Sequence, residues 1–305
     1  MTQKTLSLRA WSELLLLAAI WGASFLSTAL VLRELGYLST VALRLFGAAV
    51  VLWAVVLIRG LPVPRDLRIW GAFAVMGLLN NAVPFTLITW AQQHIPTGLT
   101  GILNASTAIF GVLIAALVFA DERLSRRKLT GITLGFAGSA MVIGPSALTQ
   151  FDPTSLAQLA MLASSVSYGL AGSWARARLG GLRPQVAAAG MLSMSTLMMI
   201  PVALSIEGIP DLSLAAPSWM ALLYLSVIAT AGAYLLYYRV LAMAGAGNLM
   251  LVTLLLTPFA ILLGALVLGE DLPPRAYAGF VLLAAGLLAI DGRVLRLAER
   301  KRNRV

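Results

Sequence analysis

The sequence has no cysteine and a single histidine, His94. It can therefore form no disulfide and no thiolate or multi-histidine metal site, and we expect neither a metal nor a cofactor. Charged residues are also scarce, at 11% of 305 residues against about 25% in a typical soluble domain. So little charge cannot cover a water-soluble surface of this size. Together with a hydrophobic content of 60%, it predicts an all-α polytopic membrane protein.

Apolar runs long enough to cross a bilayer recur along the whole chain. A membrane-spanning helix needs about 20 mostly apolar residues, and these runs are too long and too uniform for barrel strands. The first run has no clear small-residue cleavage site, so we expect no cleavable signal peptide. The sequence predicts ten spans joined by short loops: 9–32, 37–58, 69–91, 98–120, 128–146, 154–175, 184–206, 216–240, 247–269 and 275–292.

The basic residues predict the orientation of these spans. Of the 22 Lys and Arg residues, 18 lie at the N-terminus, in the loops after the second, fourth and sixth spans, and beyond the last span. The opposite loops hold only Arg33 and Arg275. The positive-inside rule then places both termini in the cytoplasm, in a bacterial inner membrane. Because orientation accounts for the net charge of +10, we expect contact with anionic lipid and no nucleic-acid partner.

The two halves of the chain repeat each other at an offset of 148 residues. Over residues 122–144 there are eight identities: Glu122 with Glu270, Leu124 with Leu272, Arg127 with Arg275, Gly131 with Gly279, Leu134 with Leu282, Ala137 with Ala285, Gly138 with Gly286 and Gly144 with Gly292. Each half holds five spans, and an odd number inserts the second copy upside down. We therefore predict two inverted five-helix repeats, 1–148 and 149–292, and a basic cytoplasmic tail, 293–305. Inverted repeats are typical of secondary transporters.

Several motifs give the chain a family resemblance. They are "WGASF" (21–25), "LRLFGAA" (43–49), "ADERLSRRKLTGITLGFAGSAMVIG" (120–144) and "LTPFAILLGALVLGEDLPPRAYAGFVLLAAGLLAI" (256–290). With these motifs the sequence resembles the drug/metabolite transporter (DMT) superfamily and, within it, the EamA family. The first repeat departs from the last motif, with Ile109 or Phe110 where Pro258 would align. The resemblance implies ten helices, an inverted repeat and metabolite movement, often outward. The chain is similar to the YddG-type exporters of aromatic and other apolar amino acids.

Polar and aromatic residues inside the spans are candidates for a substrate site near mid-membrane. In the third span Asn80 and Pro84 share a helical face, and the missing N–H of the proline frees the Asn80 carbonyl. The competing interpretations are polar contacts between helices and, above all for Tyr238, anchoring at the membrane interface. The candidate substrate-binding residues are Trp21, Ser24, Arg44, Asn80, Asn81, Pro84, Asn104, Tyr168, Tyr234 and Tyr237. Glycines expected to allow close helix contacts are Gly22, Gly111, Gly138, Gly264 and Gly286.

Arg44 is the least expected of these residues because a charge inside a bilayer is costly. It lies about seven residues, or ~10 Å, from the outer end of its span. The sequence leaves open three partners for its guanidinium group: a carbonyl freed by a broken helix, the carboxylate of Glu34, or the carboxylate of a substrate. The first two would make Arg44 a structural anchor, and the third would make it a binding residue.

Aromatic and amide groups without fixed carboxylates suit a neutral or zwitterionic substrate of moderate size. No acidic residue lies near mid-membrane, and Glu122 and Glu270 fall at loop junctions, where we expect capping or pairing. We therefore predict an exporter of aromatic or other apolar amino acids that works by alternating access and facilitated diffusion, as a monomer or a dimer. Exporters of nucleotide sugars or quaternary ammonium compounds, a channel and a non-transporting receptor stay open. No zinc-protease, nucleophile-elbow or P-loop motif is present, so an enzyme is not expected.

Overall fold

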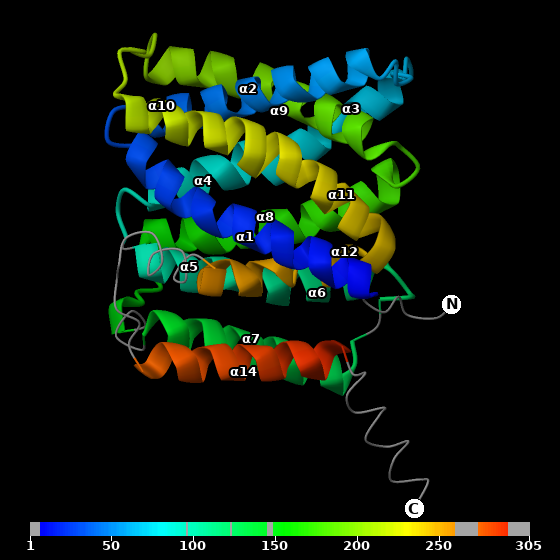
Figure 1. Cartoon of the computed structure of the whole chain (residues 1–305), viewed down its shortest axis with the longest axis vertical. Coiled ribbons are helices and arrows are strands. Elements are labelled where there is room, and N and C mark those ends of the chain that lie inside the picture. Colours follow the sequence, from blue (N-terminus) through cyan, green and yellow to red (C-terminus); the bar gives the residue numbers. More distant parts are fainter. Residues whose placement is uncertain (1–6, 96, 123, 145–148, 260–273, 292–305) are drawn as a thin grey trace, which may run out of the picture.

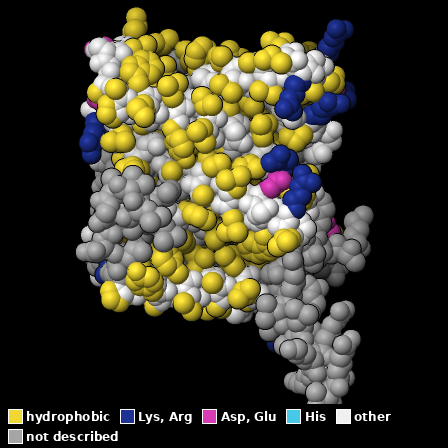
Figure 2. All heavy atoms as spheres, viewed as in Figure 1, with side chains coloured by type: hydrophobic (Ala, Val, Ile, Leu, Met, Phe, Trp, Pro, Cys, Tyr) yellow, Lys and Arg dark blue, Asp and Glu magenta, His cyan; other side chains and the backbone are white. Residues whose placement is uncertain are grey.

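A computed structural model describes residues 7–95, 97–122, 124–144, 149–259 and 274–291. Every regular element among them is helical, which confirms the all-α prediction. The long helices lie side by side with their axes in a common direction (Figure 1). α1 begins and α14 ends at the same end of this bundle (Figure 1), which we call the basic end because most Lys and Arg side chains gather there (Figure 2).

The order of the elements follows the predicted spans. The first half contains α1 (Leu8–Val31), α2 (Tyr37–Ile58), α3 (Leu67–Gly77), η1 (Leu78–Ala82), α4 (Val83–Ala91), α5 (Thr97–Ala105), α6 (Thr107–Val118) and α7 (Arg126–Ile143). The second half contains α8 (Leu156–Trp174), η3 (Ala175–Leu179), α9 (Pro184–Ile206), α10 (Ala216–Leu223), η4 (Tyr224–Gly232), α11 (Ala233–Ala244), α12 (Ala246–Leu249) and α14 (Pro274–Asp291).

Six continuous helices are long and apolar enough to cross a membrane: Leu8–Val31, Tyr37–Ile58, Leu67–Ala91, Leu99–Val118, Pro184–Ile206 and Ala216–Ala244. α7 and α8 occupy the fifth and sixth predicted spans but are not among these six. Shorter apolar helices, Ala246–Phe259 and Pro274–Ile290, occupy the described parts of the last two. The rest of the ninth span and the tail 293–305 lie outside the described residues.

On the face that Figure 2 shows, the described surface of the bundle is largely apolar between its two ends. Large hydrophobic side chains such as Phe46, Leu117 and Val281 are 50%, 87% and 70% exposed. In water such a surface would aggregate, whereas lipid tails cover it without cost. The chain is therefore a multi-pass helical membrane protein.

Three helices widen locally into π-helical segments, η1, η3 and η4. η1 lies just before Pro84, whose ring nitrogen carries no hydrogen to donate. A π-helical turn inserts an extra residue and releases carbonyl groups from the regular α-helical ladder. Both η1 and η4 place such carbonyls beside the central cavity described below.

α7 and α14 pack through a reciprocal pair of glycine contacts. A Cβ atom on Gly138 would lie 2.8 Å from the carbonyl oxygen of Gly279, and one on Gly286 would lie 2.5 Å from that of Gly131. These are four of the six glycines that match at the offset of 148 residues, and each contacts the counterpart of the other. Reciprocal contacts of this kind are typical of an interface with two-fold symmetry.

The other glycines expected at close contacts have different outcomes. A Cβ atom on Gly111 would lie only 2.2 Å from Cγ of Met250, so this glycine does allow a close approach. Gly22 is buried in α1. Gly264 lies outside the described residues.

Adding one methyl group between α7 and α14 should destabilise the protein. We expect Gly138→Ala to lower the free energy of unfolding by about 1–3 kcal/mol, because the new atom meets backbone that cannot move without separating α7 from α14. Thermal unfolding of the purified protein in detergent measures the change. Gly71→Ala is the matched control, since nothing lies within 4 Å of its Cβ position. Equal melting temperatures for the two variants would contradict the close contact.

Candidate functional site

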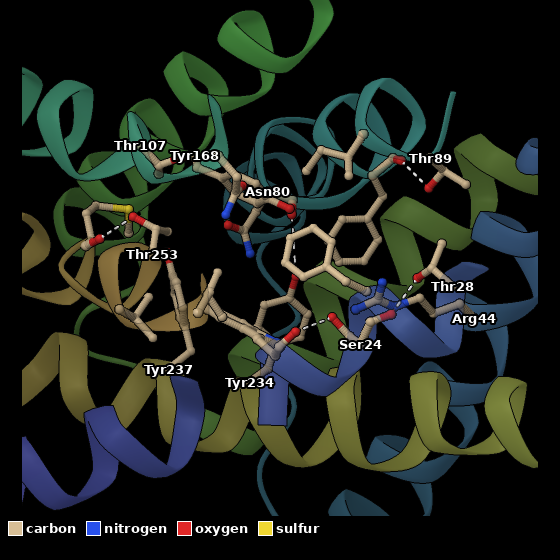
Figure 3. A pocket seen from close by; sticks show the side chains of 18 of the residues that line it. Ser24, Thr28, Arg44, Asn80, Thr89, Thr107, Tyr168, Tyr234, Tyr237 and Thr253 are labelled. Atoms are coloured by element: carbon tan, nitrogen blue, oxygen red, sulfur yellow. Dashed lines mark hydrogen bonds between the residues drawn. The ribbon is translucent and has the colours of Figure 1, made fainter. Parts of the chain in front are cut away.

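A cavity of about 740 Å³, including its open mouth, lies within the bundle (Figure 3). Residues of α1, α2, η1, α4, α5, α6, α8 and α11 and residues 250–256 line it, so both halves of the chain contribute. Its wall reaches Gln92, next to the end of α4, and the last turn of α1 at Thr28. The cavity therefore runs from mid-bundle toward the end opposite the basic end. Eight predicted candidates line it: Trp21, Ser24, Arg44, Asn80, Asn104, Tyr168, Tyr234 and Tyr237.

The two remaining candidates, Asn81 and Pro84, are buried but do not line the cavity. Asn81 Nδ2 donates to Ser195 Oγ at 2.8 Å, and its Oδ1 accepts a short hydrogen bond from the Tyr234 hydroxyl group. The same hydroxyl lies 3.4 Å from the carbonyl oxygen of Asn80, the group that Pro84 was expected to free (Figure 3). Asn81 and Pro84 therefore hold the wall of the cavity in shape.

Three aromatic rings form one side of the cavity. Trp21 lies 6.3 Å from both Tyr234 and Tyr237, centroid to centroid, and the two tyrosines lie 5.8 Å apart. The indole Nε1 of Trp21 donates to the carbonyl oxygen of Ala229 in η4 at 2.9 Å, which fixes the ring. Edge-on and tilted aromatic contacts of this kind make a rigid apolar wall against which another ring can pack.

Arg44 points into the cavity from α2 (Figure 3). Its Nε donates to Thr230 Oγ1 at 2.7 Å, Nη2 lies 3.5 Å from the carbonyl oxygen of Ala229, and its Cζ lies 4.1 Å from the Phe85 ring centroid. Thr230 and Ala229 belong to η4, so the expected contact with a broken helix is present. No carboxylate among the described residues pairs with this guanidinium group.

Glu34, one of the partners considered for Arg44, bonds elsewhere. Its carboxylate accepts from Ser218 Oγ at 2.5 Å and from the Ala215 N–H at 2.8 Å. These two bonds, the Ser218 hydroxyl first, lower the pKa of Glu34 below its usual value. Glu34 thus ties the end of α1 to the start of α10 and leaves Arg44 without a counter-charge.

Three buried polar atoms of the cavity wall have no hydrogen-bond partner within the described part of the chain. They are Gln92 Nε2, Thr107 Oγ1 and Tyr237 Oη. Buried polar groups in proteins are nearly always satisfied, by protein, by water or by a ligand. Unpaired atoms on residues that line a cavity therefore indicate hydrogen-bonding positions for its contents.

A buried ionic cluster closes the basic end of the bundle between the two halves. Glu122 accepts from the backbone N–H groups of Ala246 and Gly247, at 2.8 and 2.9 Å, and from Arg176 Nη1 at 2.6 Å. Asp121 pairs with Arg176 Nη2 at 2.5 Å, and Lys128 Nζ lies 3.8 Å from Glu122. The expected capping and pairing role of Glu122 is confirmed. Glu270 lies outside the described residues.

The structure also corrects one prediction and adds residues that the sequence analysis passed over. Tyr238 is not an interface anchor: it is 5% exposed, and its hydroxyl lies 3.6 Å from Met191 Sδ, because α11 packs this face against α9. Phe85, Gln92 and Thr253 also line the cavity and are not among the residues that the sequence predicted. Nothing in their apolar or loop-like sequence surroundings distinguishes them from lipid-facing or surface positions.

A multi-pass helical protein with a polar and aromatic cavity open toward one end has the features of a membrane transporter. The chain belongs to the EamA-like transporter family, whose model matches residues 11–144 and again residues 155–290. Within the described residues no group of three or more potential metal ligands occurs.

The chain is similar to named transport proteins over nearly its whole length. It is 25% identical, over 95% of both chains, to a protein of Streptantibioticus cattleyicolor named "Probable terminal-alkyne amino-acid exporter". It is 26% identical, over 90% of this chain and 91% of the relative, to a "Probable amino-acid metabolite efflux pump" of Salmonella typhimurium. A solved crystal structure with 18% sequence identity has the same fold, with a TM-score of 0.78 over 92% of this chain and 98% of that chain.

Proposed function

We propose that this protein exports small apolar metabolites, aromatic or other apolar amino acids, across the bacterial inner membrane as a secondary transporter. The observation that carries this proposal is the cavity between the two halves, with one cation, Arg44, opposite aromatic rings. A carboxylate can bind the cation while the side chain of the substrate packs on the rings. The names of two relatives as amino-acid exporters support the same substrate class.

The proposed architecture is ten membrane-spanning helices in two inverted repeats, 1–148 and 149–292. Its support is the double match to one family model and the reciprocal glycine contacts of α7 with α14. An inverted repeat lets each half adopt the conformation of the other, so that a central site opens alternately to the two sides. The gathering of Lys and Arg at the end where α1 begins supports a cytoplasmic location for that end and for both termini.

With this orientation the cavity opens toward the outside, and the ionic cluster of Glu122 and Arg176 closes the cytoplasmic end. Export would then require that cluster to separate so that substrate can enter from the cytoplasm. Among the described residues no Asp, Glu or His lines the cavity, so the described wall offers no group that would carry a proton with the substrate. We therefore propose facilitated export down the substrate gradient.

Two other substrate classes fit the cavity less well. A nucleotide sugar brings at least two phosphate charges, and Arg44 is the one cationic side chain in the described wall. A quaternary ammonium compound would be repelled by Arg44 and would find no carboxylate there. An enzyme would need a reactive group, and the family to which the chain belongs consists of transporters.

Counterflow in proteoliposomes tests the proposed function. Purified protein is reconstituted, loaded with an unlabelled amino acid and diluted into a trace of labelled phenylalanine. We expect saturable uptake that depends on apolar amino acid inside and is unchanged by an imposed pH gradient. Accumulation driven by the pH gradient would refute facilitated export, and absence of counterflow for every neutral amino acid would refute the proposed substrate class.

Two adjacent tyrosines provide a matched test of the cavity. Tyr237 lines the cavity, and its buried hydroxyl has no partner among the described residues, whereas Tyr238 does not line the cavity and its hydroxyl contacts Met191 Sδ. We expect Tyr237→Phe to raise the half-saturating substrate concentration by about 3- to 10-fold, the loss of one hydrogen bond, without lowering the melting temperature. Tyr238→Phe should leave that concentration unchanged. Identical counterflow parameters for the two variants would contradict a substrate contact at Tyr237.

A further inference from the structure

The geometry points to a site that recognises the carboxylate of its substrate and has no subsite for the ammonium group. We infer that aromatic and apolar carboxylic acids lacking an amino group are substrates as well, whereas the corresponding amines are not. This inference rests on the proposed function and specifies which chemical group that function requires.

The first observation is the uncompensated charge of Arg44. Its Nε and Nη2 contact neutral oxygens of η4, and Nη1 makes no hydrogen bond within the described residues. A guanidinium group offers five N–H donors in a planar fork that matches a carboxylate. A cation held in a low-dielectric cavity without a counter-ion is stabilised by a ligand that brings one. The charge of Arg44 therefore selects for a carboxylate.

The second observation is an unpaired donor in the same cavity. Gln92 Nε2 is buried in the wall and has no acceptor among the described residues. The N–H groups of this nitrogen can be satisfied by an oxygen of the substrate but not by an ammonium group, which has only hydrogens to donate. Gln92 Nε2 and the Arg44 guanidinium group thus both offer donors to an acceptor of the substrate.

The third observation concerns where an ammonium group would have to lie. In an α-amino acid bound by its carboxylate to Arg44, the ammonium group stays on the adjacent carbon, next to the same positive charge. No Asp or Glu in the described part of the wall offsets that repulsion. The face of the Phe85 ring is already occupied by Arg44, at 4.1 Å. The unpaired hydroxyls of Thr107 and Tyr237 lie at the other side of the cavity from Arg44 (Figure 3).

The consequence is that the ammonium group of an amino acid contributes no attraction of its own. Removing the ammonium group should leave binding intact, and removing the carboxylate should abolish binding. A transporter with this preference would carry the amino acid together with deaminated or N-acylated acids of the same side chain.

The test compares three compounds that share one ring: phenylalanine, 3-phenylpropanoate and 2-phenylethylamine. Each competes, from outside, with labelled phenylalanine in counterflow, over the first seconds at pH 8 because the protonated acid crosses lipid unaided. We expect 3-phenylpropanoate to inhibit at concentrations within about 3-fold of phenylalanine and 2-phenylethylamine to need at least about 30-fold more. In Arg44→Gln the acid should lose at least about 10-fold in potency while the amine gains or stays the same.

Thermal stabilisation of the purified wild-type protein by the same compounds is measured in parallel. If phenylalanine counterflow occurs but the amine inhibits as well as phenylalanine and the acid does not, the inference is overturned and the proposed function survives. If no counterflow occurs yet the acid stabilises the protein and the amine does not, the proposed function and transport of the acid both fail, and recognition of the carboxylate by this cavity stands. Stabilisation by the amine alone, or by none of the three, overturns the inference.

Discussion

Arg44→Met is expected to lower the counterflow efficiency for phenylalanine by about 10- to 100-fold or more, the loss of a hydrogen bond to a charged group. The same substitution should leave the melting temperature of the substrate-free protein unchanged or raised. The reason is that Arg44 makes one short hydrogen bond, to Thr230, and holds a charge away from water without a carboxylate partner among the described residues. A methionine of similar length packs on Phe85 and removes that charge.

The two measurements together separate binding from anchoring. If Arg44 holds η4 in place, Arg44→Met loses both stability and transport, because the contacts to Ala229 and Thr230 are then structural. If Arg44 holds substrate, transport falls and stability does not. Arg44→Lys is the control for charge: it keeps a cation but lacks the planar fork, so we expect intermediate transport. Full transport in Arg44→Met would contradict a role in substrate binding.

Glu122→Gln is expected to have the largest effect on stability. The carboxylate is 5% exposed and has two backbone N–H donors, Arg176 and Lys128 as partners. A neutral amide leaves the buried Lys128 without its counter-charge and weakens the cap on α12. Breaking a buried ion pair from one side costs about 3–5 kcal/mol, which should lower the melting temperature by several degrees.

Glu122→Gln should also shift the protein toward an inward-open state, because the Glu122 cluster joins the two halves at the end proposed to be cytoplasmic. A double-mutant cycle with Arg176→Gln should give a coupling free energy above about 1 kcal/mol. Glu207→Gln is the matched control. Glu207 also caps a helix, accepting from the N–H groups of Leu38 and Ser39, but no cation pairs with it within the described residues. Additive effects of the Glu122 and Arg176 substitutions would contradict the ionic closure.

Patterns local in sequence predicted the helices and most of the candidate site. The spacing of Asn80 and Pro84, and the missing N–H of the proline, were enough to locate a carbonyl that the Tyr234 hydroxyl approaches at 3.4 Å. The repeat at 148 residues singled out the glycines that meet between α7 and α14. The first feature depends on chemistry within one helical turn, and the second on a direct comparison of the two halves, and both can be read from the sequence.

Features that depend on which helices are neighbours were not predictable in this way. Tyr238 was assigned to the interface from its depth in the span, but packing of α11 on α9 buries it. The end position of Glu122 indicated a cap without indicating that the capped helix is α12, more than 120 residues away. The π-helical segment η4 gives Arg44 and Trp21 their carbonyl acceptor at Ala229. Its sequence has no marker, such as a proline, that would have predicted the π-helical turn.

The most direct test of the central claim is substrate protection of a single cysteine in the cavity, since the chain has none of its own. Ser24→Cys places a thiol in the cavity wall, and Ser27→Cys, three residues on and outside that wall, is the control. The account predicts that phenylalanine slows reaction of a small thiol reagent with the cysteine of Ser24→Cys, at the concentration that half-saturates counterflow, and leaves Ser27→Cys unaffected. Saturable counterflow with no protection in Ser24→Cys would contradict the assignment of this cavity as the transport site.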